Sequence, residues 1–398
     1  MKTLDFRVSG FLFSGISSGI KKDDSRDLGL IYSEVPAQVA GLFTTNALKA
    51  APVQLDMERV KGGLCQALIV NSGNANACTG GQGLREARRI SSWVAKRLGM
   101  DEQLVFVSST GVIGTPLPLK KIKEGIPKLI EALSPEGWMG TVEAIMTTDT
   151  FPKVAVATCR IQGKQVKLCG MVKGAGMICP NLATMLSFLV TDANLKAPLL
   201  QRMLEGAAEV SYNRITVDGE TSTNDTVLLL ANGKAGHPSL NRMDRDGEKF
   251  QSMLSEVCQN LAKSLVKDGE GATKFIEILI QGARDREDAK QAAYAVAHSP
   301  LVKTAFFGED ANWGRILCAL GHSGAQINPN HIDVFFDKVP IVKNGMGTGS
   351  RVEERANQIL KKKSFKVTVD LHKGKSQFSV FTTDLSIDYV KINASYRS

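Results

Sequence analysis

The chain has 398 residues, 43% of them hydrophobic, which is enough to bury a sizeable core in one large domain plus a smaller one, or in two comparable halves. Its formal net charge of +9 comes from basic residues that are scattered among acidic ones rather than gathered in runs. Nucleic-acid binders more often carry a basic stripe interleaved with aromatic residues, and only 6% of the residues are aromatic here, so the composition favours small anionic substrates over nucleic acid.

The cysteines and the amino terminus indicate a cytoplasmic protein. The seven cysteines form no Cys-x-x-Cys pair and have no histidine at zinc-ligand spacing, so we expect reduced thiols and no metal site. Residues 9–20 are interrupted by glycine and serine and lack the apolar core of a signal peptide. No apolar run approaches the roughly 20 residues that cross a bilayer, so no membrane association is expected.

Short apolar runs alternate with longer amphipathic stretches, which predicts a mixed α/β (α+β) protein. The elements predicted in the amino-terminal half are, in chain order, a strand at 67–70, a helix at 84–98, a strand at 104–107, a polar loop at 108–111, and an antiparallel hairpin of strands 154–158 and 165–168. Periodicity does not decide whether the strands form one sheet or two.

The carboxyl-terminal half continues the alternation. A strand at 185–190 precedes a helical pattern that begins at Pro198 and extends through Val210, with the proline near the first turn, where its lack of an N–H matters least. Further strands are predicted at 227–230, 275–280, 332–336 and 365–369, and further helices at 250–266, 285–298 and 352–360.

The segment before Thr184 allows two interpretations. Gly174 and Gly176 supply backbone freedom, and Pro180 favours an extended or turn geometry, so the segment can be an ordinary loop that leads into a strand. Alternatively, the peptide bond between Ala183 and Thr184 breaks. The freed α-amine of Thr184 would then be a general base beside its own hydroxyl, with an unperturbed pKa of about 7.7–8.0.

Eight motifs extend this second interpretation over the whole chain. They are residues 71–80 (NSGNANACTG), 109–114 (STGVIG), 146–150 (MTTDT), 173–184 (KGAGMICPNLAT), 214–219 (RITVDG), 268–274 (DGEGATK), 308–315 (GEDANWGR) and 392–396 (INASY). In this order they resemble the ornithine acetyltransferase family, also called the bifunctional glutamate N-acetyltransferase and amino-acid acetyltransferase of arginine biosynthesis. Cys179 departs from the histidine or small residue that members often carry there.

The resemblance implies a particular architecture. The precursor cleaves itself between Ala183 and Thr184, which gives an α chain of residues 1–183 and a β chain of residues 184–398. Together the chains form an α/β/β/α layered sandwich like that of N-terminal-nucleophile enzymes, and the β chain includes a smaller carboxyl-terminal α/β region. Two α and two β chains are expected in the assembly.

The resemblance also implies the chemistry. Thr184 takes the acetyl group of N-acetylornithine, releases ornithine and passes the acetyl group to glutamate, which is ping-pong covalent catalysis. Thr110 and Gly111 stabilise the oxyanion, although alone they would be taken for a turn after a strand. No cofactor is expected, and acetyl-CoA is a possible second acetyl donor.

Substrate binding is assigned by the same resemblance. Lys173 corresponds to the position near the substrate carboxylate and Glu270 to the position that meets an amine; without the family, both would be taken for solvated surface charges. Further substrate-binding positions are Thr147, Thr184, Asn393 and Ser398.

Two other classes of function stay open. An N-terminal-nucleophile aminopeptidase or amidase would use the same threonine, and recognition of a δ-ammonium by Glu270 would distinguish the acetyltransferase from it. A metabolite-binding protein without catalysis would keep its chain intact. The glycines of residues 80–83 precede a helical pattern, so an anion could bind there, but they lack the Lys-Ser/Thr of a P-loop.

Overall fold

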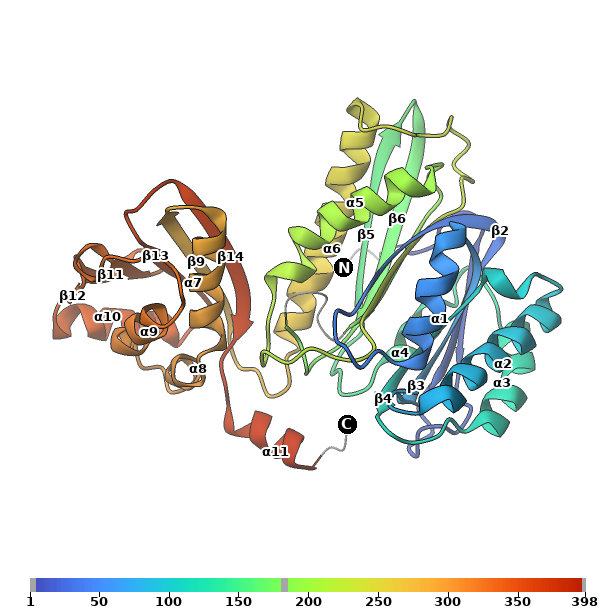
Figure 1. Cartoon of the computed structure of the whole chain (residues 1–398), viewed down its shortest axis with the longest axis horizontal. Coiled ribbons are helices and arrows are strands. Elements are labelled where there is room, and N and C mark those ends of the chain that lie inside the picture. Colours follow the sequence, from blue (N-terminus) through green and yellow to red (C-terminus); the bar gives the residue numbers. More distant parts are fainter. Residues whose placement is uncertain (1–4, 180–184, 396–398) are drawn as a thin grey trace. The chain divides into compact units, whose positions relative to one another are not determined.

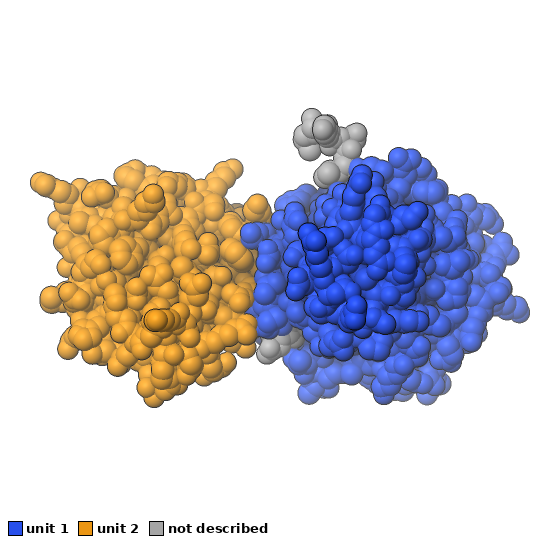
Figure 2. Space-filling model, turned by 90° about the horizontal axis from the view of Figure 1, so that it is seen from above, with its two compact units in different colours: residues 1–213, 220–265, 397–398 blue, residues 214–219, 266–396 orange. Residues whose placement is uncertain are grey.

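The computed structural model describes residues 5–179 and 185–395, which divide into two compact units (Figure 2). Of these described residues, unit 1 contains those up to 213 and 220–265, and unit 2 contains 214–219 and 266–395. The prediction of a mixed α/β protein with a smaller carboxyl-terminal α/β region is confirmed. The predicted cleavage point at 183/184 lies outside the described residues.

Unit 1 contains an eight-stranded sheet with the order β4-β3-β2-β8-β7-β6-β5, and β1 pairs with β2 (Figure 1). Its strands are β1 (Phe11–Ile16), β2 (Leu28–Phe43), β3 (Leu64–Asn74), β4 (Val105–Val112), β5 (Lys153–Ile161), β6 (Lys164–Lys173), β7 (Leu186–Thr191) and β8 (Thr226–Ala231). Its α-helices are α1 (Ala51–Arg59), α2 (Gly80–Leu98), α3 (Leu119–Glu131), α4 (Trp138–Ile145), α5 (Ala197–Glu209) and α6 (Arg245–Lys267), and 3₁₀ turns lie at Val60–Gly62, Glu102–Leu104 and Tyr212–Arg214.

The long strand β2 belongs to both halves of this sheet. Its residues 28–33 pair with β1 and residues 38–43 pair with β8, whereas β3 pairs with residues 28–32 and again with residues 37–38. The register with β3 shifts between Tyr32 and Ala37, and Pro36 lies in this interval. Because proline has no N–H for a strand ladder, it suits the place where β2 changes partners.

The two halves of the sheet share one hydrophobic cluster on their inner faces. Leu68 and Phe106 reach it from β3 and β4, and Met171 and Leu228 reach it from β6 and β8. Strands that lie far apart in the sheet order can meet in one cluster only if the sheet folds over, so that its halves pack face to face.

Helices cover the outer faces. A second cluster joins α1, α2 and α3 to the outer face of β3 and β4, with Ile69 and Ile90 among its members. On the other half, α6 packs on β6 at Gly170, where an added Cβ would lie 2.7 Å from Leu261 of the helix. Figure 1 shows α5 and α6 beside β5 and β6. The order helix, sheet, sheet, helix is the predicted α/β/β/α arrangement.

Unit 2 is built on a six-stranded sheet with the order β12-β11-β10-β13-β9-β14, in which β9 and β13 are parallel. Its strands are β9 (Phe275–Ala283), β10 (Asp333–Phe336), β11 (Val339–Lys343), β12 (Met346–Gly347), β13 (Ser364–Asp370) and β14 (Ser376–Thr383). Its helices are α7 (Arg286–His298), α8 (Pro300–Phe307), α9 (Trp313–Gly321), α10 (Ser350–Leu360) and α11 (Ile387–Ser395), with a 3₁₀ turn at Pro329–His331. One apolar core joins this sheet to α7 to α10.

One predicted element is wrong. Residues 108–111 were expected to form a polar loop, but they continue strand β4, in which Thr110 pairs with Ser72 and Gly111 pairs with Gly73. Parallel pairing with β3 supplies the backbone partners, so the polar side chains do not end the strand. The predicted hairpin is present as β5 and β6, and α5 begins near Pro198 as expected.

Among the described residues, no helix is both long enough and apolar enough to cross a membrane.

We predict that Gly15→Ala destabilises unit 1. Gly15 of β1 faces α4, and an added Cβ would lie 1.8 Å from the carbonyl oxygen of Gly140, which is backbone and cannot rotate away. Overpacking of this kind should lower the free energy of unfolding by about 3 kcal/mol, measured by urea denaturation. Gly62→Ala is the control, because an added Cβ there meets nothing within 4 Å, and its change should stay below about 0.5 kcal/mol. Equal stabilities of the two variants would contradict the packing described for β1 and α4.

Candidate active site

The structure describes only part of the predicted site. Ala183, Thr184 and Ser398 lie outside the described residues. The remaining predicted residues fall into two groups: Thr110, Gly111, Thr147 and Lys173 belong to unit 1, and Glu270 and Asn393 belong to unit 2.

Lys173 and Thr110 are in direct contact. Lys173 ends β6 and Thr110 lies in β4, and the Nζ atom of Lys173 donates to Oγ1 of Thr110 at 3.2 Å. Lys173 is 4% exposed and Thr110 7%, so the alternative of a solvated lysine is wrong. Because an ammonium only donates, Oγ1 accepts this bond, and the hydroxyl hydrogen of Thr110 is free to point at another acceptor.

Gly111 is a position that only glycine can occupy. Its φ is +131°, and an added Cβ would lie 2.4 Å from the carbonyl carbon of Gly73 and 2.5 Å from the nitrogen of Asn74. The close approach of β3 and β4 backbones therefore requires the absence of a side chain here. It leaves a peptide group without a side chain directly after Thr110.

A buried carboxylate lies next to this pair. Asp149 accepts the N–H of Gly174 at 2.7 Å and that of Thr147 at 2.9 Å, and its Oδ1 is 2.5 Å from Nζ of Lys153. Burial by itself would raise the pKa of Asp149, but the charges of Lys173 and Lys153 and the Gly174 N–H outweigh it, so the pKa lies below its usual value. Asp149 thus connects Thr147 to the turn that follows Lys173.

A third lysine approaches the same region. The Nζ atom of Lys21 donates to the carbonyl oxygens of Met146 at 2.7 Å and Arg26 at 2.9 Å. Burial lowers the pKa of Lys21, and Lys173 adds to this shift, whereas Asp23, Asp27 and Asp149 oppose it. The three lysines therefore lie together with the buried carboxyl groups of Asp27 and Asp149.

The residue that follows Thr184 is anchored to β8. The N–H of Met185 donates to Oδ1 of Asp225 at 2.9 Å. Asp225 is fully buried, and burial raises its pKa well above the usual value, against the Met185 N–H and the charge of Lys173. The preceding Asn224 donates to the carbonyl oxygens of Ser109 and Ala75, both at 2.8 Å. The start of β8 thus connects the segment after Thr184 to the end of β4.

In unit 2, Glu270 and Asn393 are hydrogen-bonded to each other. Nδ2 of Asn393, on α11, donates to Oε2 of Glu270 at 2.9 Å. The loop that carries Glu270 is fixed by Asp384, which accepts the N–H groups of Thr273 at 2.8 Å and Lys274 at 2.9 Å. The predicted amine-binding carboxylate therefore has a defined partner on the last described helix.

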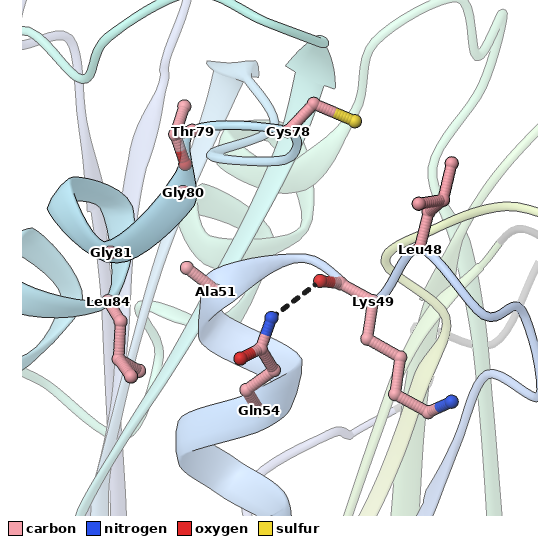
Figure 3. Close-up of a pocket in the computed structure, with 9 residues that line it drawn as sticks. All are labelled: Leu48, Lys49, Ala51, Gln54, Cys78, Thr79, Gly80, Gly81 and Leu84. Carbon is pink, nitrogen blue, oxygen red and sulfur yellow. Dashed lines mark hydrogen bonds between the residues drawn. The ribbon is translucent and has the colours of Figure 1, made fainter.

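A separate pocket of about 290 Å³ lies at the amino-terminal ends of α1 and α2 (Figure 3). Gly80, Gly81 and Cys78 line it, and Figure 3 shows Gln54 of α1 donating to the carbonyl of Lys49, at 2.8 Å. None of the predicted site residues that the structure describes lines this pocket. An anion at residues 80–83 stays a prediction.

Sequence reasoning overlooked four charged residues that the structure places at the site: Lys21, Asp149, Lys153 and Asp225. Asp149 lies in the motif of residues 146–150, two positions after Thr147, a predicted substrate-binding residue. This carboxylate could therefore have been predicted to belong to the site. The other three gave none, because a single charge in a strand or loop is most often solvated.

We predict that Asp149→Asn destabilises unit 1, because it removes the negative charge that lies 2.5 Å from the fully buried ammonium of Lys153. The loss in unfolding free energy should be about 3–5 kcal/mol at pH 7, and Asp149→Asn with Lys153→Met should recover part of it. Since the folded pKa of Asp149 is lowered, its contribution is present above pH ~4 and is lost as the pH falls through the folded value. Urea denaturation at several pH values measures this.

The matched control is Glu58→Gln, which breaks the exposed pair of Glu58 with Arg88 in the same unit. It should cost less than about 1 kcal/mol. If Asp149→Asn cost no more than this control, Asp149 would not be the counterion of Lys153.

Comparisons with known proteins place the chain in a family. A model described as the ArgJ family matches residues 12–398. The arginine biosynthesis bifunctional protein ArgJ of Geobacter sulfurreducens is 53% identical over 391 residues, which cover 98% of this chain and 100% of that relative. The protein of the same name from Syntrophotalea carbinolica is 51% identical over 392 residues, with the same coverage.

Solved structures carry related names. The crystal structure of the arginine biosynthesis bifunctional protein ArgJ from Bacillus halodurans is 41% identical, with a TM-score of 0.49 over 52% of this chain and 96% of that one. The ornithine acetyltransferase of Mycobacterium tuberculosis, complexed with ornithine, is 32% identical, with a TM-score of 0.41 over 46% of this chain and 95% of that one. Since the family model spans nearly the whole chain and the curated relatives match it over their full length, this chain belongs to the ArgJ family.

Proposed function

We propose that the chain cleaves itself between Ala183 and Thr184 and then transfers the acetyl group of N-acetylornithine to glutamate through an acetyl ester on Thr184. Membership of the ArgJ family makes it an acyltransferase of arginine biosynthesis. The observation that carries the finer proposal is the buried contact of Lys173 with Thr110, beside Gly111. It supports the proposal because it is a preorganised donor group of the kind that an acyl-transfer reaction needs.

The first half-reaction uses the threonine as nucleophile and base together. The α-amine of Thr184 removes the hydroxyl proton while Oγ attacks the acetyl carbonyl carbon, which forms a tetrahedral oxyanion. The C–N bond then breaks, the amine proton passes to the leaving nitrogen, and ornithine departs. In the second half-reaction the amine of glutamate attacks the ester, and N-acetylglutamate and free Thr184 result.

Thr110 and Gly111 are the proposed oxyanion donors. The ammonium of Lys173 occupies a lone pair of the Thr110 hydroxyl, which polarises the hydroxyl and leaves its hydrogen for the oxyanion. The Gly111 backbone can approach an acetyl group closely, because it carries no side chain. Both donors lie on strand β4, so they are fixed before the substrate arrives.

The charged residues are proposed to meet the two ends of the substrate. Lys173 and Thr147 are proposed to meet the α-carboxylate region. Asp149 connects them, because it accepts the N–H of Thr147 and that of Gly174, the residue after Lys173. Glu270 is proposed to meet the amine, and Asn393 and Ser398 to complete substrate binding. Asn393 already holds Oε2 of Glu270 and would orient that carboxylate.

The proposal includes three further points that follow from the family. Acetyl-CoA is a second acetyl donor, so the enzyme makes N-acetylglutamate in two ways. No cofactor takes part, because the threonine itself carries the acetyl group. The assembly contains two α and two β chains, which native mass spectrometry would test.

We predict that the purified protein runs as two chains of 183 and 215 residues (398 − 183 = 215), with Thr184 at the amino terminus of the second. Thr184→Ala should stay intact, because the nucleophile of the cleavage is lost. Denaturing electrophoresis with intact-mass analysis measures both. Thr158→Ala, at an exposed position of β5, is the control and should be processed fully. A wild-type chain that stays whole would point to a binding protein without catalysis.

We predict that the processed enzyme exchanges label between ornithine and N-acetylornithine without glutamate, since the acetyl-enzyme forms in the first half-reaction. Thr110→Val keeps the β-branched shape of β4 but loses the hydroxyl, and the exchange should slow about 100- to 1000-fold. Thr158→Val is the control. Net hydrolysis of N-acetylornithine without exchange would instead favour the aminopeptidase or amidase alternative.

A further inference from the structure

The dipeptide Asn224-Asp225 contacts the neighbours in sequence of the proposed oxyanion donor and of the proposed nucleophile. Nδ2 of Asn224 donates to the carbonyl of Ser109, the residue directly before Thr110. The carboxyl of Asp225 accepts the N–H of Met185, the residue directly after Thr184. The backbone of Asp225 is fixed as well, because its carbonyl accepts the N–H of Thr44 at 2.9 Å. Two neighbouring side chains thus connect the segment of the nucleophile to the strand of the oxyanion hole.

The carboxyl of Asp225 is held by one described hydrogen bond. The residue is fully buried, and among the described residues Oδ2 has no hydrogen-bond partner, while Oδ1 is 2.9 Å from the Met185 nitrogen. Asp56 shares the burial and the unpartnered Oδ2, so what distinguishes Asp225 is its contact with the residue that directly follows Thr184. The peptide group held by Oδ1 contains the carbonyl carbon of Thr184.

We propose that Asp225 is the positioning residue of the nucleophile, holding the peptide group after Thr184 so that the threonine is aligned with Thr110 and Gly111. This inference rests on the proposed function and deepens it. Asp225 acts through Met185 rather than on the substrate. Asn224 donates to the carbonyl of Ser109 and so holds the same loop against β4, the strand that carries Thr110.

Self-cleavage is the step that needs this alignment most. Oγ of Thr184 attacks the carbonyl carbon of Ala183, the C–N bond breaks, and the hydroxyl proton passes to the freed nitrogen. Water then hydrolyses the resulting ester, which leaves the carboxyl group of Ala183 and the hydroxyl of Thr184. The peptide group on the far side of the threonine must stay still while this happens, and Asp225 holds it.

The Met185 N–H needs an acceptor oxygen and not a charge. Burial raises the pKa of Asp225, although the charge of Lys173 opposes this. An amide oxygen accepts a backbone N–H as a carboxyl oxygen does. An asparagine, neutral and of the same shape, should therefore replace Asp225 well.

The experiment follows self-cleavage of freshly expressed full-length chain over time by denaturing electrophoresis, from pH 6 to 9. Asp225→Ala should cleave at least about tenfold more slowly than wild type, because the peptide group loses its anchor. Asp225→Asn should cleave within about threefold of wild type, with the midpoint of its pH profile within a few tenths of a unit. Asp225→Leu, which fills the space but accepts no hydrogen bond, should cleave as slowly as Asp225→Ala, so rescue by asparagine alone separates the acceptor from mere filling of space.

The matched control is Asp56→Ala. Asp56 is also fully buried in unit 1, its Oδ1 accepts one backbone N–H, from Val107 at 3.0 Å, and its Oδ2 also lacks a described partner. It should lose stability by a similar amount, as judged by thermal melting, yet cleave at the wild-type rate.

Three results would overturn the inference: Asp225→Ala cleaving as fast as wild type, Asp225→Asn cleaving as slowly as Asp225→Ala, or Asp56→Ala slowing cleavage equally. If Asp225→Ala does not fold, the pH profile of Asp225→Asn decides, and a profile displaced by a unit or more contradicts the role. A wild-type chain that never cleaves contradicts the proposed function itself, which is a different outcome.

Discussion

The contact between Lys173 and Thr110 is the constraint on which the rest of unit 1 depends. Lys173 lies on β6 and Thr110 on β4, and β3, β2, β8 and β7 stand between these strands in the sheet. In a flat sheet, five steps of about 4.8 Å would separate them by about 24 Å, yet Nζ and Oγ1 are 3.2 Å apart. The sheet must therefore fold over, and β2, which pairs with β1 along its first part and with β8 along its last, is the strand that allows it.

The folded sheet buries charged side chains. Backbone N–H and carbonyl groups supply many of the hydrogen bonds that these charges would otherwise make with water. Asp149 is satisfied by two N–H groups as well as by Lys153, and Lys21 is satisfied by two carbonyl oxygens. Such groups are rigid, so the charges keep their places without a mobile partner. Asp225 differs from them, because burial raises its pKa against the attraction of Lys173. The pKa of Asp149 is thus lowered and that of Asp225 raised in the same unit, according to the cations and N–H groups around each.

The sequence predicted the periodic elements well and the site only where a family pattern named it. The helix at 84–98 and the hairpin around Gln162 follow from clear periodicity. Strand β1 was overlooked because glycine and serine interrupt it, and residues 108–111 were taken for a loop because their partners on β3 are not visible from local polarity. The same limit hid Asp225, whose role depends on Met185, 40 positions away in the chain.

The strands before and after residues 180–184 explain how the two products of a cleavage there would stay associated. Strand β6 ends at Lys173 and β7 begins at Leu186, and these two residues pair in the antiparallel ladder between the strands. Strand β2, before the proposed cleavage point, also pairs with β8, after it, so the two products share a second strand pair. Breaking the bond between Ala183 and Thr184 would remove one covalent connection and no strand pairing. The hydrogen bonds of the sheet, together with the shared inner cluster, would hold β6 of one chain and β7 of the other together.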